Sequence, residues 1–175
     1  HYDHCSFADL GKIVKDGTKI IAPPDCQSTI AKLETKIKME IVEPGQELEL
    51  GEIKIFAVPS YNIDKHFHPK DEHWLGYILK FQDLNIYHAG DTDLIPEMQK
   101  LTGFGSGKDF IALLPVGGKF VMDAEEASEA ASLIKPTIAI PMHYGSVCGS
   151  VEDALEFKKL CEERGLRIEV LEKER

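Results

Sequence analysis

The chain has 175 residues, of which 43% are hydrophobic and 29% charged, a composition typical of a globular protein with a substantial core. The formal net charge of -10 argues against binding to nucleic acid or to anionic membrane surfaces, although it leaves room for a local basic patch. No apolar stretch approaches the roughly 20 residues of a membrane-spanning helix, and no signal peptide is visible. The four cysteines are scattered and form no CxxC pair, which favours reduced thiols and a cytoplasmic protein.

The chain opens with His1-Tyr2-Asp3-His4, which brings two imidazoles and a carboxylate together. These are natural ligands for ions such as zinc or manganese. In an extended loop alternate side chains point the same way, so His1 and Asp3 share one direction and His4 takes the other. One short loop can therefore serve two adjacent metal positions; a histidine-rich surface loop is the alternative. Because neither an initiator Met nor a strand precedes this loop, we expect the chain to be incomplete at its N-terminus.

The next part of the chain alternates between helical and extended periodicity. Ser6 is the expected N-cap of a helix that Gly17 ends. The pattern then predicts a strand over 19–22, a brief helix over 28–34, and strands over 38–42, 48–50 and 53–57. We expect the segment from about residue 38 to residue 57 to form antiparallel ribbons with one wet face.

Residues 60–74 follow neither period and contain three of the seven histidines, His66, His68 and His73. A loop of this length without secondary structure is usually functional or mobile. We therefore expect it to lie over the site and to contribute to the choice of substrate.

Beyond this loop, strands and helices alternate as in an α/β protein. Asp123 and Ser150 are the expected N-caps of two helices, which Pro136 and Gly165 end. Strands are predicted over 75–81, 84–89, 110–116, 137–140 and 168–170, and a further helix over about 95–101.

Two polar residues come directly after buried strands of this second half. Asp91 follows the strand that ends at Ala89, and His143 follows the strand that ends at Ile140. In α/β proteins, residues just past the carboxyl ends of strands converge on the functional site. Each residue alone has another explanation, because Asp91 suits a turn and His143 suits a satisfied buried histidine. Together with the loop at residues 1–4 they predict one shared site.

These motifs resemble those of the metallo-β-lactamase superfamily. His1-Tyr2-Asp3-His4 is similar to the second half of its His-x-His-x-Asp-His signature, and residues 86–93 are similar to its strand and bridging aspartate. Residues 113–118 and 140–145 resemble its later blocks. Their order and spacing are most similar to the small prokaryotic metal-dependent hydrolases that include the L-ascorbate-6-phosphate lactonases. The resemblance implies one domain over residues 1–175, a four-layer αββα sandwich whose N-terminal strands are missing from this chain.

The resemblance also implies the metal ligands. His1 belongs to the first metal position, and Asp3, His4 and His143 belong to the second. Asp91 bridges both, and Asp3 also orients the nucleophile, so Asp3 and Asp91 are the implied catalytic residues. The implied cofactor is one or two divalent ions, with zinc favoured and manganese, iron or nickel as alternatives.

The sequence departs from the superfamily pattern at the first metal position. The first histidine of the signature would precede His1, and Asn62 stands where the middle histidine is expected. The third ligand is therefore left open between Asn62, or no ligand, and His66 or His68 from the long loop. A one-metal enzyme is the remaining alternative.

The implied function is hydrolysis of an ester, lactone or phosphoester bond in a small-molecule substrate by a metal-bound hydroxide. A phosphodiesterase or nuclease is an alternative, because ribonuclease Z shares the fold, but the acidic chain counts against it. A non-catalytic metal-binding relative is a further alternative, which the imperfect first position keeps open. Lys70 and Lys119 are candidates for an anionic substrate group, with solvated lysines as the other interpretation. The oligomeric state is not determined by the sequence.

Overall fold

The computed structural model describes residue 1 and residues 3–172. The helices are α1 (Phe7–Ile13), α2 (Gln27–Ile30), α3 (Ala124–Ile134) and α4 (Val151–Glu163), and the 3₁₀ segments are η1 (Pro24–Cys26), η2 (Lys70–Glu72) and η3 (Pro96–Gly105). The strands are β1 (Lys19–Ala22), β2 (Lys38–Ile41), β3 (Glu47–Leu50), β4 (Ile53–Pro59), β5 (Leu75–Lys80), β6 (Leu84–His88), β7 (Asp109–Pro115) and β8 (Ile138–Met142).

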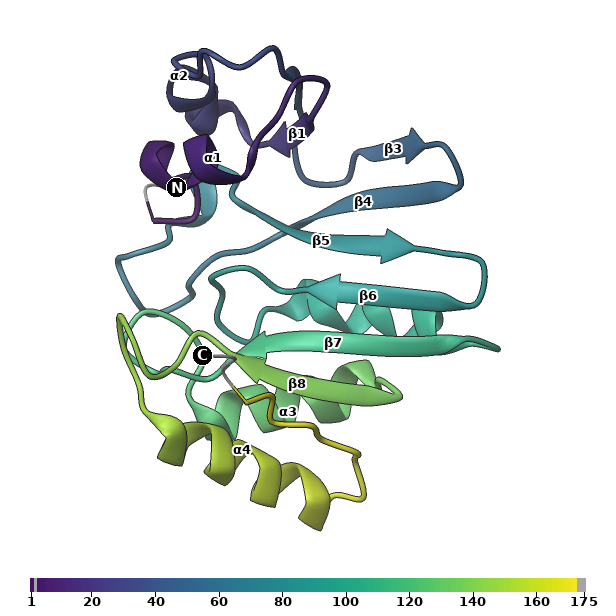
Figure 1. The fold of residues 1–175 in the computed structure, drawn as a ribbon. Helices are drawn as coiled ribbons and strands as arrows, with labels where there is room; N and C mark the ends of the chain where they lie inside the picture. Colours follow the sequence, from purple (N-terminus) through teal and green to yellow (C-terminus); the bar gives the residue numbers. More distant parts are fainter. Residues whose placement is uncertain (2, 173–175) are drawn as a thin grey trace.

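The main sheet has six strands in the order β3-β4-β5-β6-β7-β8 (Figure 1). Strands β3 to β6 pair antiparallel with their neighbours; short turns join β3 to β4 and β5 to β6, whereas residues 60–74 join β4 to β5. Strands β6, β7 and β8 are parallel to one another. The parallel half needs crossovers, which η3 and α3 provide. As a result β4, β6, β7 and β8 all run in one direction, and their carboxyl ends lie along the same edge of the sheet.

The core lies between the helices and one face of this sheet. Alternate residues of the strands, among them Ile78, Tyr87, Phe110 and Leu114, are buried against the helices. Helix α3 contributes small side chains such as Ala127, which permit close packing on the sheet. Burial of this apolar face is the main source of stability, at roughly 25 cal/mol for each square ångström removed from water.

The opposite face of the sheet is also apolar but only partly buried. It carries Leu79, Ile86, Ile111, Leu113 and Ile140, all of intermediate exposure. No helix packs on this face in the part of the chain that the structure describes.

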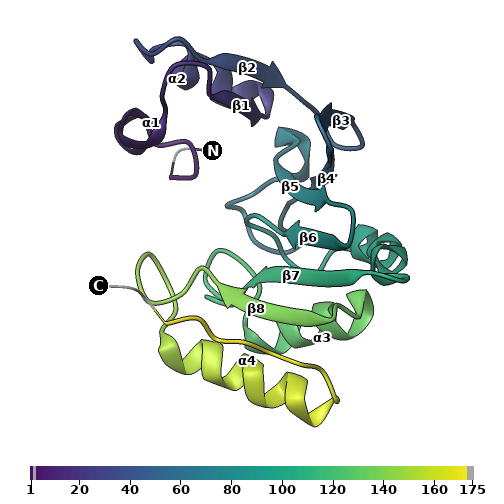
Figure 2. The ribbon, with the colours of Figure 1, turned by 45° about the vertical axis from the view of Figure 1, so that its right-hand side comes forward.

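A smaller unit built from residues 3–41 lies at the β3–β4 end of the sheet (Figure 2). It contains a second, two-stranded sheet in which β1 and β2 are parallel, with a small apolar cluster around Cys26 and Ile30. The Tyr77 hydroxyl donates a 3.2 Å hydrogen bond to the Ile21 carbonyl and so ties this unit to β5. The described residues thus form a six-stranded sheet with helices on one face and a separate two-stranded sheet.

Most predicted elements are confirmed, and the N-caps of α1, α3 and α4 are the residues expected. Helix α1, however, ends at Ile13 with Val14 as its C-cap, before the Gly17 that was expected to end it. The Ser6 side chain accepts from the Asp9 amide at the start of α1. Asp123 and Glu126 form a reciprocal capping box at the start of α3, as Ser150 and Asp153 do at α4.

Three further local predictions are wrong. The helix expected over 95–101 is the 3₁₀ segment η3, which begins at Pro96 without a side-chain cap and includes two glycines. The strand expected over 168–170 is a single bridge from Ile168 to Ala139. Strand β2 pairs in parallel with β1 rather than in an antiparallel ribbon with β3, because η1 and α2 carry the chain back to the start of β1. None of the helices described here is both long and apolar enough to cross a bilayer.

Candidate metal centre

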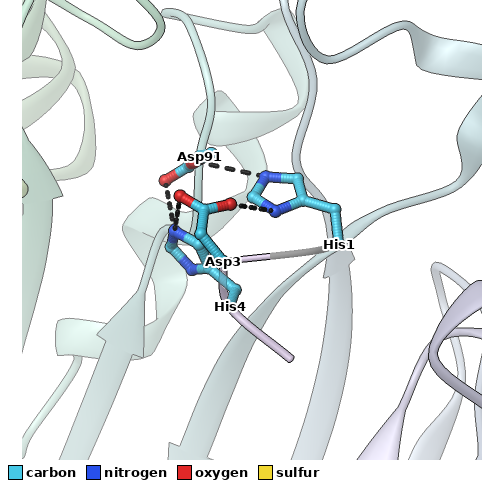
Figure 3. A group of neighbouring side chains, drawn as sticks. All are labelled: His1, Asp3, His4 and Asp91. Atoms are coloured by element: carbon cyan, nitrogen blue, oxygen red, sulfur yellow. Dashed lines mark ion pairs between the residues drawn. The ribbon is translucent and has the colours of Figure 1, made fainter. Parts of the chain in front are cut away.

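The candidate site lies at the edge where the parallel-running strands end. Asp91 follows β6, His143 follows β8, and the loop over residues 60–74 follows β4. The loop at the start of the chain lies against the same edge, and Figure 3 shows His1, Asp3 and His4 gathered around Asp91. The ligand-type atoms of these four residues all lie within 4.8 Å of one another. Strand direction therefore brings side chains together that are up to 142 positions apart in the sequence.

Asp91 is held in place by the tight turn that precedes it. Gly90 has a φ of +68°, and a Cβ atom at this position would lie 2.7 Å from the Leu75 carbonyl oxygen. The Ser60 hydroxyl donates a 2.7 Å hydrogen bond to the Asp91 carbonyl. Glycine is required here both for the positive φ and for the close approach to β5, so the turn fixes the buried Asp91 carboxylate at the sheet edge.

The two oxygens of the Asp91 carboxylate face different pairs of histidines. Nε2 of His1 lies 3.2 Å and Nε2 of His68 lies 3.3 Å from Oδ2. Nε2 of His4 lies 3.2 Å and Nε2 of His143 lies 3.3 Å from Oδ1. The rings stack in the same pairs, His1 on His68 at 4.8 Å and His4 on His143 at 5.7 Å between centroids. We call these the Oδ2 half and the Oδ1 half of the site.

Asp3 lies on the solvent side between the two halves. Its Oδ1 is 3.0 Å from Nδ1 of His1, and its Oδ2 is 3.9 Å from Nε2 of His4. The Asp3 side chain is 45% exposed, whereas the Asp91 side chain is only 5% exposed. The two carboxylates therefore differ in their surroundings: Asp91 is buried at the sheet edge, and Asp3 is exposed to solvent.

The tautomer of His68 follows from its neighbours. Its Nδ1 lies 2.9 Å from Oδ1 of Asn62 and 3.0 Å from the Phe120 carbonyl oxygen, and both of these atoms are acceptors. Nδ1 therefore carries the proton, and in the neutral ring Nε2 presents a lone pair to the Asp91 oxygen. Two lone pairs at this distance repel unless a proton or a cation lies between them, so the arrangement fits a metal ion.

A second set of hydrogen bonds holds Asn62 itself. Its Nδ2 donates to the Asp93 carboxylate at 2.9 Å and to the Phe120 carbonyl at 3.0 Å. The buried Asp93 also accepts from the Ile63 amide and from Lys65, whose Nζ lies 2.6 Å away. The Asp93 carboxylate thus organises the start of the long loop, and through Asn62 it fixes the position of His68.

The charges in the centre shift the pKa values of two groups. Burial by itself raises the pKa of the Asp91 carboxyl, but its imidazole neighbours, led by His143 and His4, reverse this and hold it well below its usual range. The Asp91 carboxylate in turn raises the pKa of His143, against the opposing effect of burial. Oδ1 of Asp91 is buried and accepts no hydrogen bond within the part of the chain described, which again fits a cation at this position.

The three candidates for the third ligand of the first metal position differ in their distance from Asp91. His68 lies beside Asp91, Asn62 lies behind His68 as its hydrogen-bond partner, and His66 is exposed on the loop. Sequence reasoning missed the Phe120 carbonyl, because a backbone atom leaves no signal in the residue type. It also missed Cys148, whose Sγ lies 3.4 Å from Nδ1 of His143.

A cavity of about 300 Å³ opens over the two halves. Its floor is polar, and its walls include Phe67 and Trp74 from the long loop together with Phe120 and Val147. Lys70 does not line it, since its Nζ is held by Glu97 at 3.0 Å and by the Tyr61 hydroxyl at 3.1 Å. The loop over residues 60–74 therefore forms one wall of the site.

Comparison with known proteins is consistent with this geometry. The sequence profile described as "Beta-lactamase superfamily domain" matches residues 1–143. A UPF0173 metal-dependent hydrolase of Pyrococcus furiosus is 34% identical over 165 residues, which cover 94% of this chain and 72% of that protein. A relative of the same name from Pyrococcus horikoshii is also 34% identical, over 91% of this chain and 70% of its own length.

Solved structures agree on the fold. A crystal structure from Parabacteroides distasonis superposes with a TM-score of 0.80 and 32% identity, covering 99% of this chain and 73% of that one. Igni18, a metallo hydrolase from Ignicoccus hospitalis, superposes with a TM-score of 0.69 and 25% identity over 96% of this chain and 81% of that one. The chain belongs to the β-lactamase superfamily, among the UPF0173 metal-dependent hydrolases. The metallo-β-lactamase fold expected from the sequence is thus confirmed, whereas the lactonase branch stays a prediction.

Proposed function

We propose that this chain is a metal-dependent hydrolase that cleaves an ester, lactone or phosphoester bond in a small molecule. The observation that carries the proposal is the convergence of four imidazole Nε2 atoms on the two oxygens of one buried carboxylate, Asp91. The names of the Pyrococcus relatives and of Igni18 support the same class of reaction.

The ligands we assign follow the two halves. His1, His68 and Oδ2 of Asp91 would hold one divalent ion, and His4, His143 and Oδ1 of Asp91 would hold the other, with Asp3 at the open side. A bound divalent ion would supply Lewis-acid charge that lowers the pKa of water and neutralises the developing oxyanion. Zinc suits this imidazole-rich set, and manganese, iron or nickel are alternatives.

Side chains of the protein would orient the attacking water and accept its proton. Asp3 is the exposed carboxylate nearest the mouth, and we assign it the orientation of the attacking water and acceptance of its proton. Asp91, with its lowered pKa, stays ionised throughout the physiological pH range and cannot take that proton.

We favour catalysis over a non-catalytic relative. That alternative depended on an incomplete first metal position, and the 3.3 Å distance from Nε2 of His68 to Oδ2 of Asp91 supports His68 as its third ligand. The net charge of -10 continues to argue against a nuclease.

Metal analysis combined with a substrate panel tests the proposal. The purified protein is assayed for zinc, manganese, iron and nickel, and then for turnover of a lactone, a thioester and a phosphodiester before and after treatment with a chelator. We expect turnover of at least one member that is lost with the metal and restored by its return. Bound metal without turnover of any member would instead favour a metal-binding protein without catalysis.

A further inference from the structure

The mouth of the active-site cavity is apolar and open to solvent. The Phe67 and Phe120 rings meet edge to face at 4.6 Å between centroids. Phe67 is 49% exposed and Val147, from the loop after β8, is 64% exposed. Exposed large apolar side chains that surround a polar floor are characteristic of a ligand-binding surface. Phe67, Phe120 and Val147, which we call the apolar wall, therefore offer contact area to an apolar part of a ligand whose polar part reaches Asp91.

The positive charges near the cavity are engaged elsewhere. No Lys or Arg of the described residues lines it. Lys65 is paired with Asp93 and Glu126, and Lys119 places its Nζ over the Phe120 ring, 4.9 Å from the centroid. With a net charge of -10 on the whole chain, an anionic group that lies away from the proposed metal ions meets repulsion and finds no lysine or arginine among the lining residues.

We propose that the substrate is a neutral ester or lactone whose acyl chain is apolar and packs against Phe67, Phe120 and Val147. This rests on the proposed function and narrows it, because an apolar wall suits an uncharged acyl chain rather than a charged group. Hydrolysis adds one water across the acyl C–O bond and releases an alcohol and a carboxylic acid. The acid loses its proton at neutral pH, and the overall charge of -10 disfavours retention of the resulting carboxylate.

A series of p-nitrophenyl esters tests the acyl chain. The metal-loaded protein is assayed with the acetate, butanoate and hexanoate, with the monoester of adipic acid, and with bis-p-nitrophenyl phosphate. We expect kcat/KM to rise about fourfold per methylene from acetate to hexanoate, the ratio that corresponds to about 0.8 kcal/mol per buried CH₂. The adipate, which has the same chain length as the hexanoate but ends in a carboxylate, should be at least about tenfold slower. Equal rates along the series, or a preference for the adipate or the phosphate, would overturn the inference and leave metal-dependent hydrolysis standing.

Two variants and a matched control locate the effect in the wall. In Phe67→Ala and Phe120→Ala we expect the gain in kcat/KM with chain length to be mostly lost. Phe7→Ala removes a phenylalanine that is 50% exposed on α1, outside this cavity, and should keep the full gain. If kcat/KM still rises with acyl chain length in both Phe67→Ala and Phe120→Ala, the assignment of the wall is wrong.

A binding measurement separates this inference from the proposed function. Trp74 is the only tryptophan of the chain and lines the cavity, so its fluorescence reports occupancy without turnover. Methyl ketones of increasing chain length, which have no leaving group, should bind more tightly with length in wild type and in Phe7→Ala but not in Phe67→Ala. If the ketones bind in this way but no ester is hydrolysed, the apolar wall is upheld and the proposed reaction is wrong. If ketone affinity does not depend on chain length, the assignment of the apolar wall is wrong.

Discussion

The two halves of the centre differ in what holds their histidines. In the Oδ2 half, the buried His68 is fixed at Nδ1 by Asn62 and the Phe120 carbonyl, and Asp93 holds Asn62 from behind. In the Oδ1 half, His4 lies on the loop at the start of the chain with 36% of its side chain exposed. His143 in that half has only the Cys148 thiol near its Nδ1, at 3.4 Å.

The difference teaches that the histidine rings of one metal centre can be held with unequal firmness. Outer partners that fix ring orientation improve metal binding, and a thiol is a weaker partner than an amide and a carbonyl together. His68 of the Oδ2 half is therefore preorganised by the fold, whereas among the described residues no histidine of the Oδ1 half has outer partners of this strength.

Replacing Asp91 should have the largest effect, because it is the one residue that both halves share. In Asp91→Ala we expect metal content to fall at both positions and turnover to drop by more than the about 100-fold that loss of an outer partner causes. Metal analysis and kcat measure this, with the exposed Asp64→Ala as control. Full metal content and turnover in Asp91→Ala would mean that the two halves do not share a bridge.

His68 and His66 provide the next test, since they are two positions apart in the same loop. His68→Ala should remove the ion of the Oδ2 half and lower turnover much more than thermal stability. His66→Ala, which alters an exposed side chain, should leave both unchanged. If the two variants behave alike in metal titrations, the Oδ2 half has been assigned wrongly.

Asn62 and Cys148 test the outer partners of the two halves directly. Asn62→Ala should lower metal affinity in the Oδ2 half by roughly 10–100-fold, because the His68 ring loses one of its two acceptors. Cys148→Ala should lower affinity in the Oδ1 half by less. Competition against a chelator of known affinity measures both. A larger loss in Cys148→Ala would reverse the comparison.

The smallest effect concerns the metal-free protein and its dependence on pH. The pKa of His143 is raised in the folded state by Asp91, so protonated His143 stabilises the fold below its unfolded pKa of about 6.5. This contribution is lost as the pH rises through the raised folded value. Urea unfolding in the presence of chelator should therefore show wild type and His143→Ala differing more at pH 5.5 than at pH 9. A gap that widens with pH would contradict the assigned pairing.

Local signals in the sequence were sufficient wherever short-range chemistry decides the structure. Ser6, Asp123 and Ser150 cap helices because their side chains bond backbone amides three residues away, which is a local event. The alternation of strands and helices predicted the parallel half of the sheet, and strand direction then predicted that Asp91 and His143 lie at one edge. The helix expected over 95–101 failed because its pattern also suits a 3₁₀ segment once Pro96 and two glycines weaken the α-helix.

Only the tertiary structure decided which residue of the long loop faces Asp91. Residues 60–74 have no regular period, so spacing does not tell which of Asn62, His66 and His68 points inward. The choice depends on contacts with distant parts of the chain, namely Asp93 after β6 and the Phe120 carbonyl after β7. A backbone carbonyl is common to every residue type, so its position comes from folding alone. The sequence by itself determined that histidines and carboxylates meet at this sheet edge, and the packed loop determined which nitrogen faces which oxygen.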